Sequence, residues 1–253
     1  MILNIFESGD GPPLVLLHGL FGAARNLGVL SRAFSGTFHV LAMDLRNHGD
    51  SPHGAMDYES MAADVAETLA REGIGQIRLC GHSMGGKTAM MLALSRPDLV
   101  ERLAVMDVAP VAYDHDYAGI VEAMRNLPLS AGLTRGEADQ ALAATVKEAP
   151  MRAFLLNNLV LGAVPRWRVG LEEIAASMPA ILSWEDPPGG RPYEGRALFL
   201  CGAASDYVPP AVEPAIMRRF PNAEIQRVAG AAHWLHADKP EQVITALQEF
   251  FTS

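Results

Sequence analysis

Two overlapping motifs, each able to support an enzyme reaction, occupy residues 81–88, GHSMGGKT. As G-x-S-x-G, the stretch predicts a sharp turn that presents Ser83 as a nucleophile. As G-x-x-x-x-G-K-T, it predicts a loop whose backbone amides hold nucleotide phosphates, with Asp107 available to hold magnesium. The two interpretations lead to different enzymes, so the neighbouring residues have to distinguish them.

The residues around Ser83 favour the interpretation in which this serine is a nucleophile. The stretch follows at least the third predicted strand, whereas a phosphate loop usually follows the first, and Met84 is bulky where such a loop prefers small residues. A strand that turns abruptly into a helix brings backbone segments close together, so positions 81 and 85 require glycine. The Met84 amide, at the start of that helix, would then stabilise the oxygen that becomes negative in acyl transfer.

Three further stretches supply partners for a nucleophilic serine. LLHGLFG (16–22) ends an early strand in a turn whose Leu20 amide can serve the same oxyanion. DLRNHGDS (44–51) ends the next strand in a loop at the same edge. In VAGAAHWLHADKPE (228–241), His233 follows the last strand and can take the serine proton, with His236 as the rival base. Asp238 is predicted to cap the helix that follows.

The acid that orients the histidine has two candidates. Asp107 follows the apolar run LAVM, and Asp206 follows the apolar run ALFLC. The acid must accept a hydrogen bond from the second imidazole nitrogen and stabilise the imidazolium. Both aspartates follow predicted strands, so the residues alone leave this choice open.

An α/β fold has to position these residues: a mostly parallel sheet flanked by helices. Amphipathic stretches at 59–72 and 240–251 are typical of helices that cover such a sheet. Short apolar runs, typical of strands buried on both faces, lie at 13–17, 39–43, 77–80, 103–106, 197–201 and 225–228.

The alternation of strands and helices stops between Pro110 and about Tyr193, where the pattern is helical only. TRGE (134–137) is a capping box that predicts a helix running to about Ala149, before Pro150. We therefore predict an α/β core of residues 1–110 and 191–253, with an inserted helical cap, or lid, of residues 111–190.

Composition excludes several classes of protein. The 253 residues are 49% hydrophobic and 19% charged, with a net charge of −9, which fits a globular protein without a basic surface for nucleic acid or anionic membrane. Cys80 and Cys201 end apolar runs, so buried free thiols are expected. The sequence shows no secretion signal and no apolar run long enough to span a membrane, so we expect a soluble cytoplasmic protein.

The motifs HGLFG, DLRNHG, GHSMGGK and AHWLHADKP, in this order, resemble the α/β-hydrolase superfamily over nearly the full length. Within it, the chain looks like the YbfF-type bacterial esterases and their mitochondrial relative, the ABHD-eleven hydrolase. The resemblance implies an eight-stranded type of sheet and a helical cap after the sixth strand. It also implies hydrolysis of acyl esters or thioesters without a cofactor.

The resemblance also bears on the base and the acid. The family's G-x-x-H spacing, with Gly230, favours His233. Most members carry the acid four residues before the proline of a D-x-x-x-P pattern. Counting back from Pro209 gives Ser205, so Asp206 is one residue out of register. In the YbfF-type group the acid follows the sixth strand, where DVAP (107–110) matches, so the resemblance implies Asp107, with Asp206 as the alternative.

We therefore expect a serine hydrolase that cleaves small to medium acyl esters or thioesters through an acyl-enzyme, with a small molecule as its partner and no metal. Arg46 or Arg166 could bind the phosphates of an acyl-CoA. The alternatives are a small-molecule receptor with little turnover, a perhydrolase and a lyase. The candidate substrate-binding residues are Phe21, His82, Trp184 and Trp234.

Overall fold

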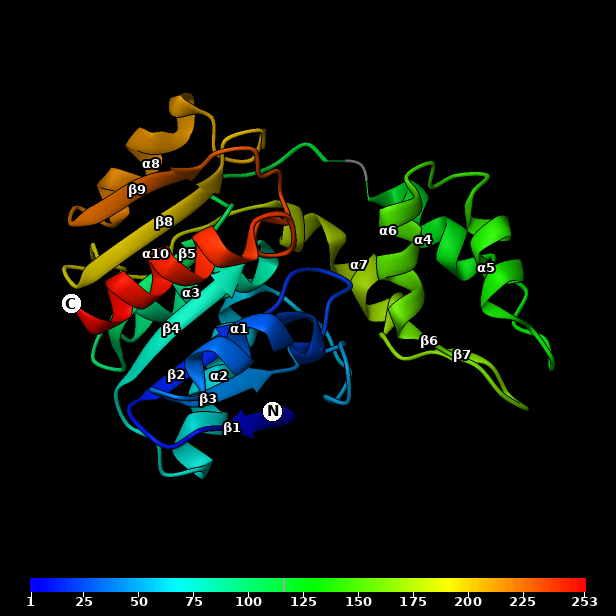
Figure 1. Ribbon diagram of the computed structural model, residues 1–253, viewed down its shortest axis with the longest axis horizontal. Helices are drawn as coiled ribbons and strands as arrows, with labels where there is room; N and C mark the ends of the chain where they lie inside the picture. Colours follow the sequence, from blue (N-terminus) through cyan, green and yellow to red (C-terminus); the bar gives the residue numbers. More distant parts are fainter. Residues whose placement is uncertain (116) are drawn as a thin grey trace.

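The computed structural model describes residues 1–115 and 117–253, and within these residues seven strands form one sheet in the order β1-β3-β2-β4-β5-β8-β9 (Figure 1). β1 pairs antiparallel with β3, and the other pairs are parallel. The strands are β1 (Ile5–Ser8), β2 (Pro13–Leu17), β3 (His39–Met43), β4 (Ile77–His82), β5 (Val100–Met106), β8 (Arg196–Gly202) and β9 (Ala223–Val228).

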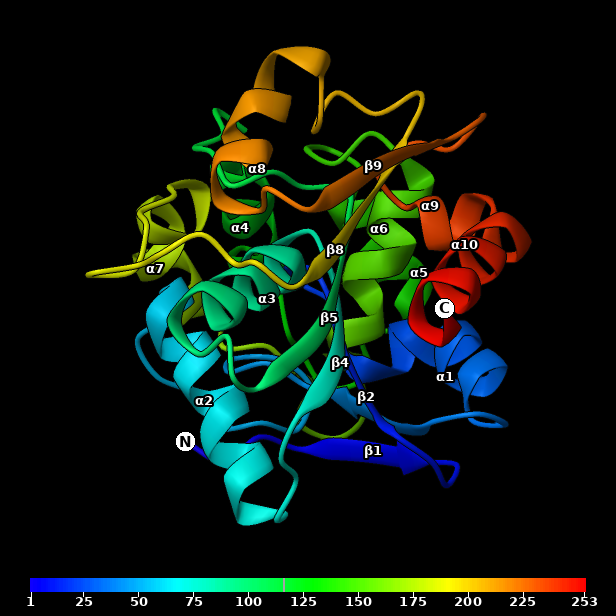
Figure 2. The ribbon, with the colours of Figure 1, turned by 90° about the vertical axis from the view of Figure 1, so that its left-hand side faces the viewer.

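Helices cover both faces of this sheet (Figure 2). One face carries α2 (Tyr58–Arg71), α3 (Met84–Ser95), η3 (Pro210–Val212) and α8 (Glu213–Arg219). The other face carries η1 (Ala24–Leu27), α1 (Gly28–Phe34), α9 (Leu235–Asp238) and α10 (Pro240–Thr252). The predicted α/β fold, a mostly parallel sheet between helices, is therefore confirmed.

Alternation along the strands builds a separate apolar core on each face. In β2, Val15 and Leu17 belong to the core under α2 and α3, whereas Leu14 and Leu16 belong to the core under α1 and α10. Successive side chains of a strand point to opposite faces, so a continuously apolar strand can supply both cores. This is why the predicted runs at 13–17 and 39–43 coincide with β2 and β3.

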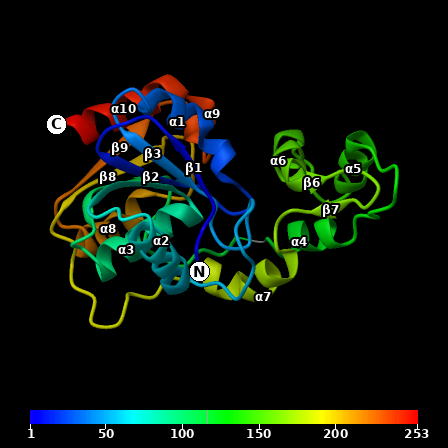
Figure 3. The ribbon, with the colours of Figure 1, turned by 90° about the horizontal axis from the view of Figure 1, so that it is seen from below.

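Residues between β5 and β8 form a second lobe beside the sheet (Figures 1 and 3). Its elements are α4 (Ala118–Arg125), α5 (Arg135–Leu142), α6 (Ala149–Leu155), η2 (Leu156–Asn158), β6 (Leu159–Val160), β7 (Arg166–Trp167) and α7 (Leu171–Leu182). We refer to this lobe as the helical lobe; its division from the core at residues 111 and 190 stays a prediction.

Several sequence expectations about these elements are wrong in detail. The helix that begins after Thr134 ends at Leu142, and Pro150 lies in the first turn of the next helix, where a missing amide proton costs no helical hydrogen bond. The helical lobe contains the short antiparallel pair β6–β7, so it is not purely helical. The resemblance implied an eight-stranded type of sheet with the cap after the sixth strand. The described sheet has seven strands, of which only β1 is antiparallel, and the lobe follows the fifth strand.

Candidate active site

The turn between β4 and α3 holds Ser83 in a conformation that few side chains adopt. Ser83 has φ 53° and ψ −119°, and its amide donates to the Met106 carbonyl of β5 at 3.0 Å. A Cβ at Gly81 would lie 2.2 Å from the Gly85 carbonyl oxygen, and one at Gly85 would lie 2.5 Å from the Leu17 oxygen. Only glycine fits this crowded turn, and it leaves Ser83 at the carboxyl edge of the sheet.

The structure brings Ser83, His233 and Asp107 together, although they follow three different strands. His233 Nε2 lies 3.1 Å from Ser83 Oγ, and His233 Nδ1 lies 2.8 Å from Asp107 Oδ2. The carboxylate can only accept, so Nδ1–H donates to Asp107 and Nε2 is left to accept from the serine hydroxyl. This is the geometry in which an imidazole can take the serine proton while a carboxylate orients it.

Asp107 is buried and accepts three hydrogen bonds. Besides His233, it accepts from the Gly202 amide at 2.8 Å and from Ser205 Oγ at 2.5 Å. Asp206 is exposed and makes no hydrogen bond to His233 among the described residues. Ser205 thus occupies the register position at which the D-x-x-x-P pattern carries an acid, and it donates to Asp107 instead. Its role was missed, although the count back from Pro209 had reached it.

The two predicted oxyanion donors are free to bind a ligand. Within the described residues, neither the Leu20 nor the Met84 amide donates to an acceptor. The next amide along, that of Phe21, is already engaged by His48 Nε2 at 3.1 Å. Asn158 of the helical lobe donates from Nδ2 to the Phe21 carbonyl at 2.6 Å, which the sequence did not reveal. Both backbone polar groups of Phe21 are therefore engaged, which holds the chain next to Leu20 in place.

Backbone strain gathers at this edge of the sheet. The described non-glycine residues with positive φ are Phe21 (60°), Asn47 (64°), Ser83 (53°) and Asp107 (53°). Each of these residues follows one of the strands β2, β3, β4 and β5. Ser83 and Asp107 belong to the contact through His233, and Phe21 follows the predicted oxyanion donor Leu20. Such conformations cost of order 1–3 kcal/mol each and persist where the surrounding structure fixes them, which is typical of functional sites.

Three buried histidines surround the site as neutral rings. His18 Nε2 accepts from the Leu45 amide and His48 Nε2 accepts from the Phe21 amide, so these rings fix loops. Burial lowers the pKa of His48 to about 3 and lowers that of His18. His82 donates from Nε2 to the His233 carbonyl at 2.8 Å, which ties the serine turn to the histidine loop. Burial holds its pKa well below the ordinary value.

His236, the rival base, lies edge-on against His82, with ring centroids 4.7 Å apart. Burial lowers the pKa of His236 to about 4, and its Nδ1 has no hydrogen-bond partner among the described residues. Asp238, predicted as the cap of α10, accepts instead from the Ala232 amide at 2.9 Å, and Lys239 takes the cap position. The aspartate therefore closes the loop that carries His233.

Arg46 is not available to a substrate phosphate. Its guanidinium makes a bidentate pair with Asp64 (Nε–Oδ2 2.6 Å, Nη2–Oδ1 2.8 Å) and also donates to the Ser60 carbonyl, in a buried setting. Arg166 is exposed on β7 and does not line the cavities at Ser83. The sequence could not reveal the partner of Arg46, because Asp64 approaches it from α2 through folding.

Aromatic side chains cover the imidazole. The Tyr207 ring stacks on His233 with centroids 3.6 Å apart and planes 14° apart. The hydroxyls of Tyr207 and Tyr117 are 2.6 Å apart, and Tyr113 donates to the Tyr207 carbonyl at 2.8 Å. Burial raises the pKa of Tyr207 and of Tyr113, so both hydroxyls stay protonated. This cover was not predicted.

Two cavities meet at Ser83. The larger, about 540 Å³, is lined by three of the candidate substrate-binding residues, Phe21, His82 and Trp234, and by Phe154, which packs on Trp234. The smaller, about 30 Å³, lies beside Lys87. Trp184 lines neither; it packs against Tyr58 and donates to Asp186, so the structure does not bring this predicted residue to the site.

Lys87, the lysine of the alternative phosphate-loop motif, is buried. Its ammonium donates to the Ser183 carbonyl at 2.8 Å, just beyond α7, and lies 4.8 and 5.3 Å from the ring centroids of Tyr113 and Tyr58. Burial lowers its pKa to about 7. The amine is engaged by the helical lobe and by two aromatic rings, so these contacts do not support the nucleotide interpretation.

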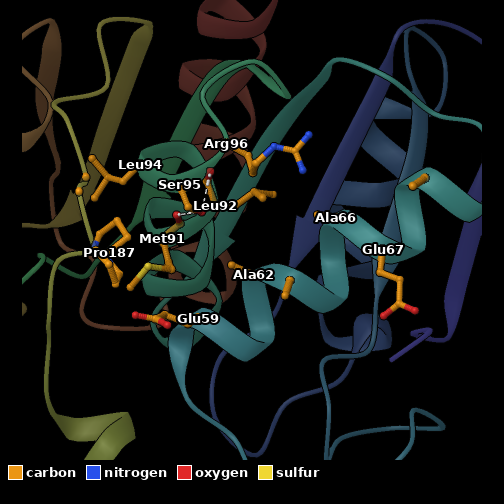
Figure 4. Close-up of a pocket in the computed structure, with 15 residues that line it drawn as sticks. Glu59, Ala62, Ala66, Glu67, Met91, Leu92, Leu94, Ser95, Arg96 and Pro187 are labelled. Atoms are coloured by element: carbon orange, nitrogen blue, oxygen red, sulfur yellow. Dashed lines mark hydrogen bonds between the residues drawn. The ribbon is translucent and has the colours of Figure 1, made fainter.

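A third cavity, about 590 Å³, lies between α2, α3 and the loop at residues 187–190 (Figure 4). Alanines of α2, including Ala62 and Ala66, face Met91 and Leu92 across it. It shares no lining residue with the cavities at Ser83, and the hydroxyl of Ser95 donates to the carbonyl of Met91 within its own helix. It therefore holds no activated nucleophile.

Cys80 and Cys201 are buried free thiols whose pKa values burial raises to about 12. Among residues 1–115 and 117–253, no group of three or more histidine, cysteine or acidic side chains is placed to hold a metal ion. In the same residues, none of the helices combines the length and the apolar character needed to cross a membrane.

Comparison with known proteins identifies the relatives of this chain. The sequence model described as the alpha/beta hydrolase family matches residues 14–246. The mouse (Mus musculus) sn-1-specific diacylglycerol lipase ABHD11 is 42% identical over 94% of this chain and 80% of its own. Esterase YbfF of Escherichia coli is 36% identical over 95% and 93%. A solved structure named marine microorganism esterase superposes with a TM-score of 0.94 at 35% identity, over 98% and 99%.

Proposed function

The chain belongs to the alpha/beta hydrolase family, and from that premise we propose that it is a serine esterase that works through an acyl-enzyme. The observation that carries the proposal is the continuous contact from Ser83 Oγ through His233 to the buried Asp107, beside two unengaged amides. The names of the relatives, which include esterases and a lipase, support ester hydrolysis as the reaction.

In the first half of the reaction, Ser83 Oγ attacks the ester carbonyl carbon while its proton passes to His233 Nε2. Asp107 accepts from Nδ1 and stabilises the imidazolium that forms. The carbonyl oxygen becomes negative and accepts hydrogen bonds from the Leu20 and Met84 amides, the latter at the N-terminus of α3. The tetrahedral intermediate then collapses, and the departing alcohol takes the proton from His233.

In the second half, water replaces the alcohol. His233 Nε2 accepts a proton from the water as it attacks the acyl carbon, and the same two amides bind the second oxyanion. Collapse returns the proton to Ser83 and releases the carboxylic acid. No step uses a cofactor, because the serine, the imidazole and the amides supply nucleophile, proton transfer and charge stabilisation.

We assign residues 111–190 to a lid over this site. Asn158 contacts the Phe21 carbonyl, Phe154 and Tyr117 line the larger cavity, and the Ser183 carbonyl binds Lys87. Loop and lobe contacts of this kind exclude water and complete a catalytic site. The Asn158 hydrogen bond links the lid to the loop that carries the Leu20 amide, so the lid also supports the oxyanion site.

The test compares wild type with Ser83→Ala on p-nitrophenyl acetate, with labelling by a fluorophosphonate as a second readout. Loss of the nucleophile is expected to lower kcat by about 10⁴-fold or more and to abolish labelling, because the triad acts as a unit. Equal hydrolysis by both proteins would contradict the proposal. A wild type that binds a fluorophosphonate at Ser83 yet turns over no ester would favour the receptor alternative.

A further inference from the structure

The two cavities at Ser83 have different linings apart from four shared residues. They share Leu20, Ser83, Tyr117 and Tyr207, so both open at the nucleophile. An ester has two arms, the acyl group and the alcohol, and each must occupy one side when the carbonyl carbon faces Ser83 Oγ. Given the proposed esterase function, the position of the proton donor determines which arm occupies which cavity.

His233 decides the orientation. It lines the larger cavity together with Ala232, Trp234 and His236, and it is not among the residues that line the smaller one. The departing alcohol oxygen must take a proton from His233 Nε2, so the alcohol lies on the His233 side. The alcohol arm therefore enters the cavity of about 540 Å³, and the acyl arm points into the cavity of about 30 Å³.

Hydrogen bonds make the end of the smaller cavity rigid. Tyr58 donates to the Ile181 carbonyl at 2.6 Å, and Lys87 donates to the Ser183 carbonyl at 2.8 Å. All three of the lining residues Tyr58, Lys87 and Ile181 are buried. A void of this size holds about one water molecule, or one methyl to ethyl group. A longer acyl chain would have to separate the end of α7 from α2 and α3.

The larger cavity favours an uncharged, apolar alcohol. Its apolar lining includes Leu27, Met151, Phe154 and Trp234, and its size suits a bulky organic group. Two carboxylates, Glu148 and Asp238, also line it, and the described lining includes no lysine or arginine. These carboxylates repel a polyanionic leaving group such as coenzyme A.

We propose that the substrates are uncharged esters of a short acyl group, acetyl or propionyl, with a large apolar alcohol. The bond between acyl carbon and alcohol oxygen breaks, the Ser83 Oγ–acyl bond forms, and the alcohol departs with the proton from His233. Water then cleaves the acyl-enzyme, so that ester and water yield a short carboxylic acid and the alcohol. Ile181 limits the acyl arm, and Phe154 contacts the alcohol arm.

The test varies the two arms independently in the wild-type protein. In a series of p-nitrophenyl acyl esters, kcat/KM is expected to be highest for acetate or propionate and to fall at least about tenfold by octanoate. In a series of acetates, kcat/KM is expected to rise from methyl to naphthyl and decyl acetate. Acetyl-CoA, offered alongside, is expected to be a poor substrate.

Two variants separate the arms. Ile181→Ala is expected to move the acyl optimum toward butyrate or hexanoate and to leave the order of the acetates unchanged. Phe154→Ala is expected to leave the acyl optimum at acetate or propionate and to lower kcat/KM for decyl acetate about tenfold. Should Ile181→Ala fail to fold, Ile181→Val, which removes one methylene, tests the same wall.

The outcomes distinguish this inference from the esterase proposal. A wild type that prefers octanoate or longer acyl groups, or that hydrolyses acetyl-CoA as fast as naphthyl acetate, overturns the inference while the serine esterase stands. An acyl optimum that shifts in Phe154→Ala and stays fixed in Ile181→Ala overturns it as well. No Ser83-dependent turnover of any ester in either series contradicts the esterase proposal itself.

Discussion

The two aspartates near the site differ in their surroundings. Asp107 is buried, has left-handed backbone and accepts from His233, Gly202 and Ser205, whereas Asp206 is exposed one residue beyond Ser205. A buried carboxylate is stable only when its oxygens are hydrogen-bonded, and these bonds also fix the direction of the imidazole.

Asp107→Asn is expected to lower kcat about 10⁴-fold, because an amide cannot hold the imidazole in the tautomer that accepts the serine proton. The matched variant Asp206→Asn is expected to stay within about threefold of wild type. Steady-state kinetics on p-nitrophenyl acetate measures both. The reverse ranking would move the acid to Asp206.

Ser205→Ala is expected to lower kcat about tenfold or more with little change in KM. The substitution removes one of the two donors to Asp107 Oδ2 and leaves His233 as the other. Loss of a hydrogen bond to a charged group costs roughly 1.5–3 kcal/mol. Ser205→Thr, which keeps the hydroxyl, is the matched control and should restore most of the rate. Equal loss in both variants would indicate a packing role.

At the scale of elements, the β4–α3 turn shows how close packing sets a reactive geometry. Gly81 and Gly85 let the start of α3 approach β2 and β4. Ser83, which lies between them, adopts the strained backbone conformation that this approach requires. The turns that follow β2 and β5 also contain left-handed residues, Phe21 and Asp107. Parallel strands end at one edge, so these turns converge.

Gly81→Ala is expected to lower the free energy of unfolding by about 2–3 kcal/mol or more, since its Cβ would lie 2.2 Å from a backbone oxygen. Gly75→Ala is the control, because a Cβ there meets no atom within 4 Å; it should stay within about 0.5 kcal/mol. Urea denaturation measures both. Equal stability of the two variants would contradict the crowded turn.

Across the whole molecule, the helical lobe is attached to the core through polar contacts near the site. Tyr58 binds the Ile181 carbonyl, Lys87 binds the Ser183 carbonyl and Asn158 binds the Phe21 carbonyl. Lys87 is a buried amine at the C-terminal end of α7, where the helix dipole favours a cation, yet burial penalises the charge.

This conflict predicts a pH dependence of stability. Burial lowers the pKa of Lys87 from 10.5 to about 7, so between these values the unfolded chain binds more protons than the folded one. The free energy of unfolding should rise with pH in this window, by up to about 1.4 kcal/mol per pH unit, and this dependence should vanish below pH 7.

The measurement subtracts the Lys87→Met profile from that of wild type between pH 7 and about 9.5, below the range in which tyrosines ionise. The difference should grow in favour of wild type as pH rises. Lys147→Met, which removes an exposed lysine of the helical lobe, should give a flat difference. A flat difference for Lys87→Met would mean that the folded protein keeps this amine charged.

Local patterns in the sequence determined much of the architecture. Continuous apolar runs located the parallel strands, the amphipathic stretch at 59–72 located α2, and the glycines around Ser83 predicted the turn. These features depend on neighbours along the chain, since periodicity and turn geometry are local properties. Where local signals compete, as at Pro150, the predicted end of a helix was wrong.

Only the tertiary structure decided which distant side chains meet. Ser83 and His233 are 150 residues apart, Asp107 and His233 126, and Phe21 and Asn158 137. Which aspartate contacts His233 depends on folding across such separations. So do the pairing of Arg46 with Asp64, the stacking of Tyr207 and the position of Trp184 away from the cavities. The physical reason is that burial and hydrogen-bond saturation are properties of packed elements, and packing is fixed when the whole chain folds.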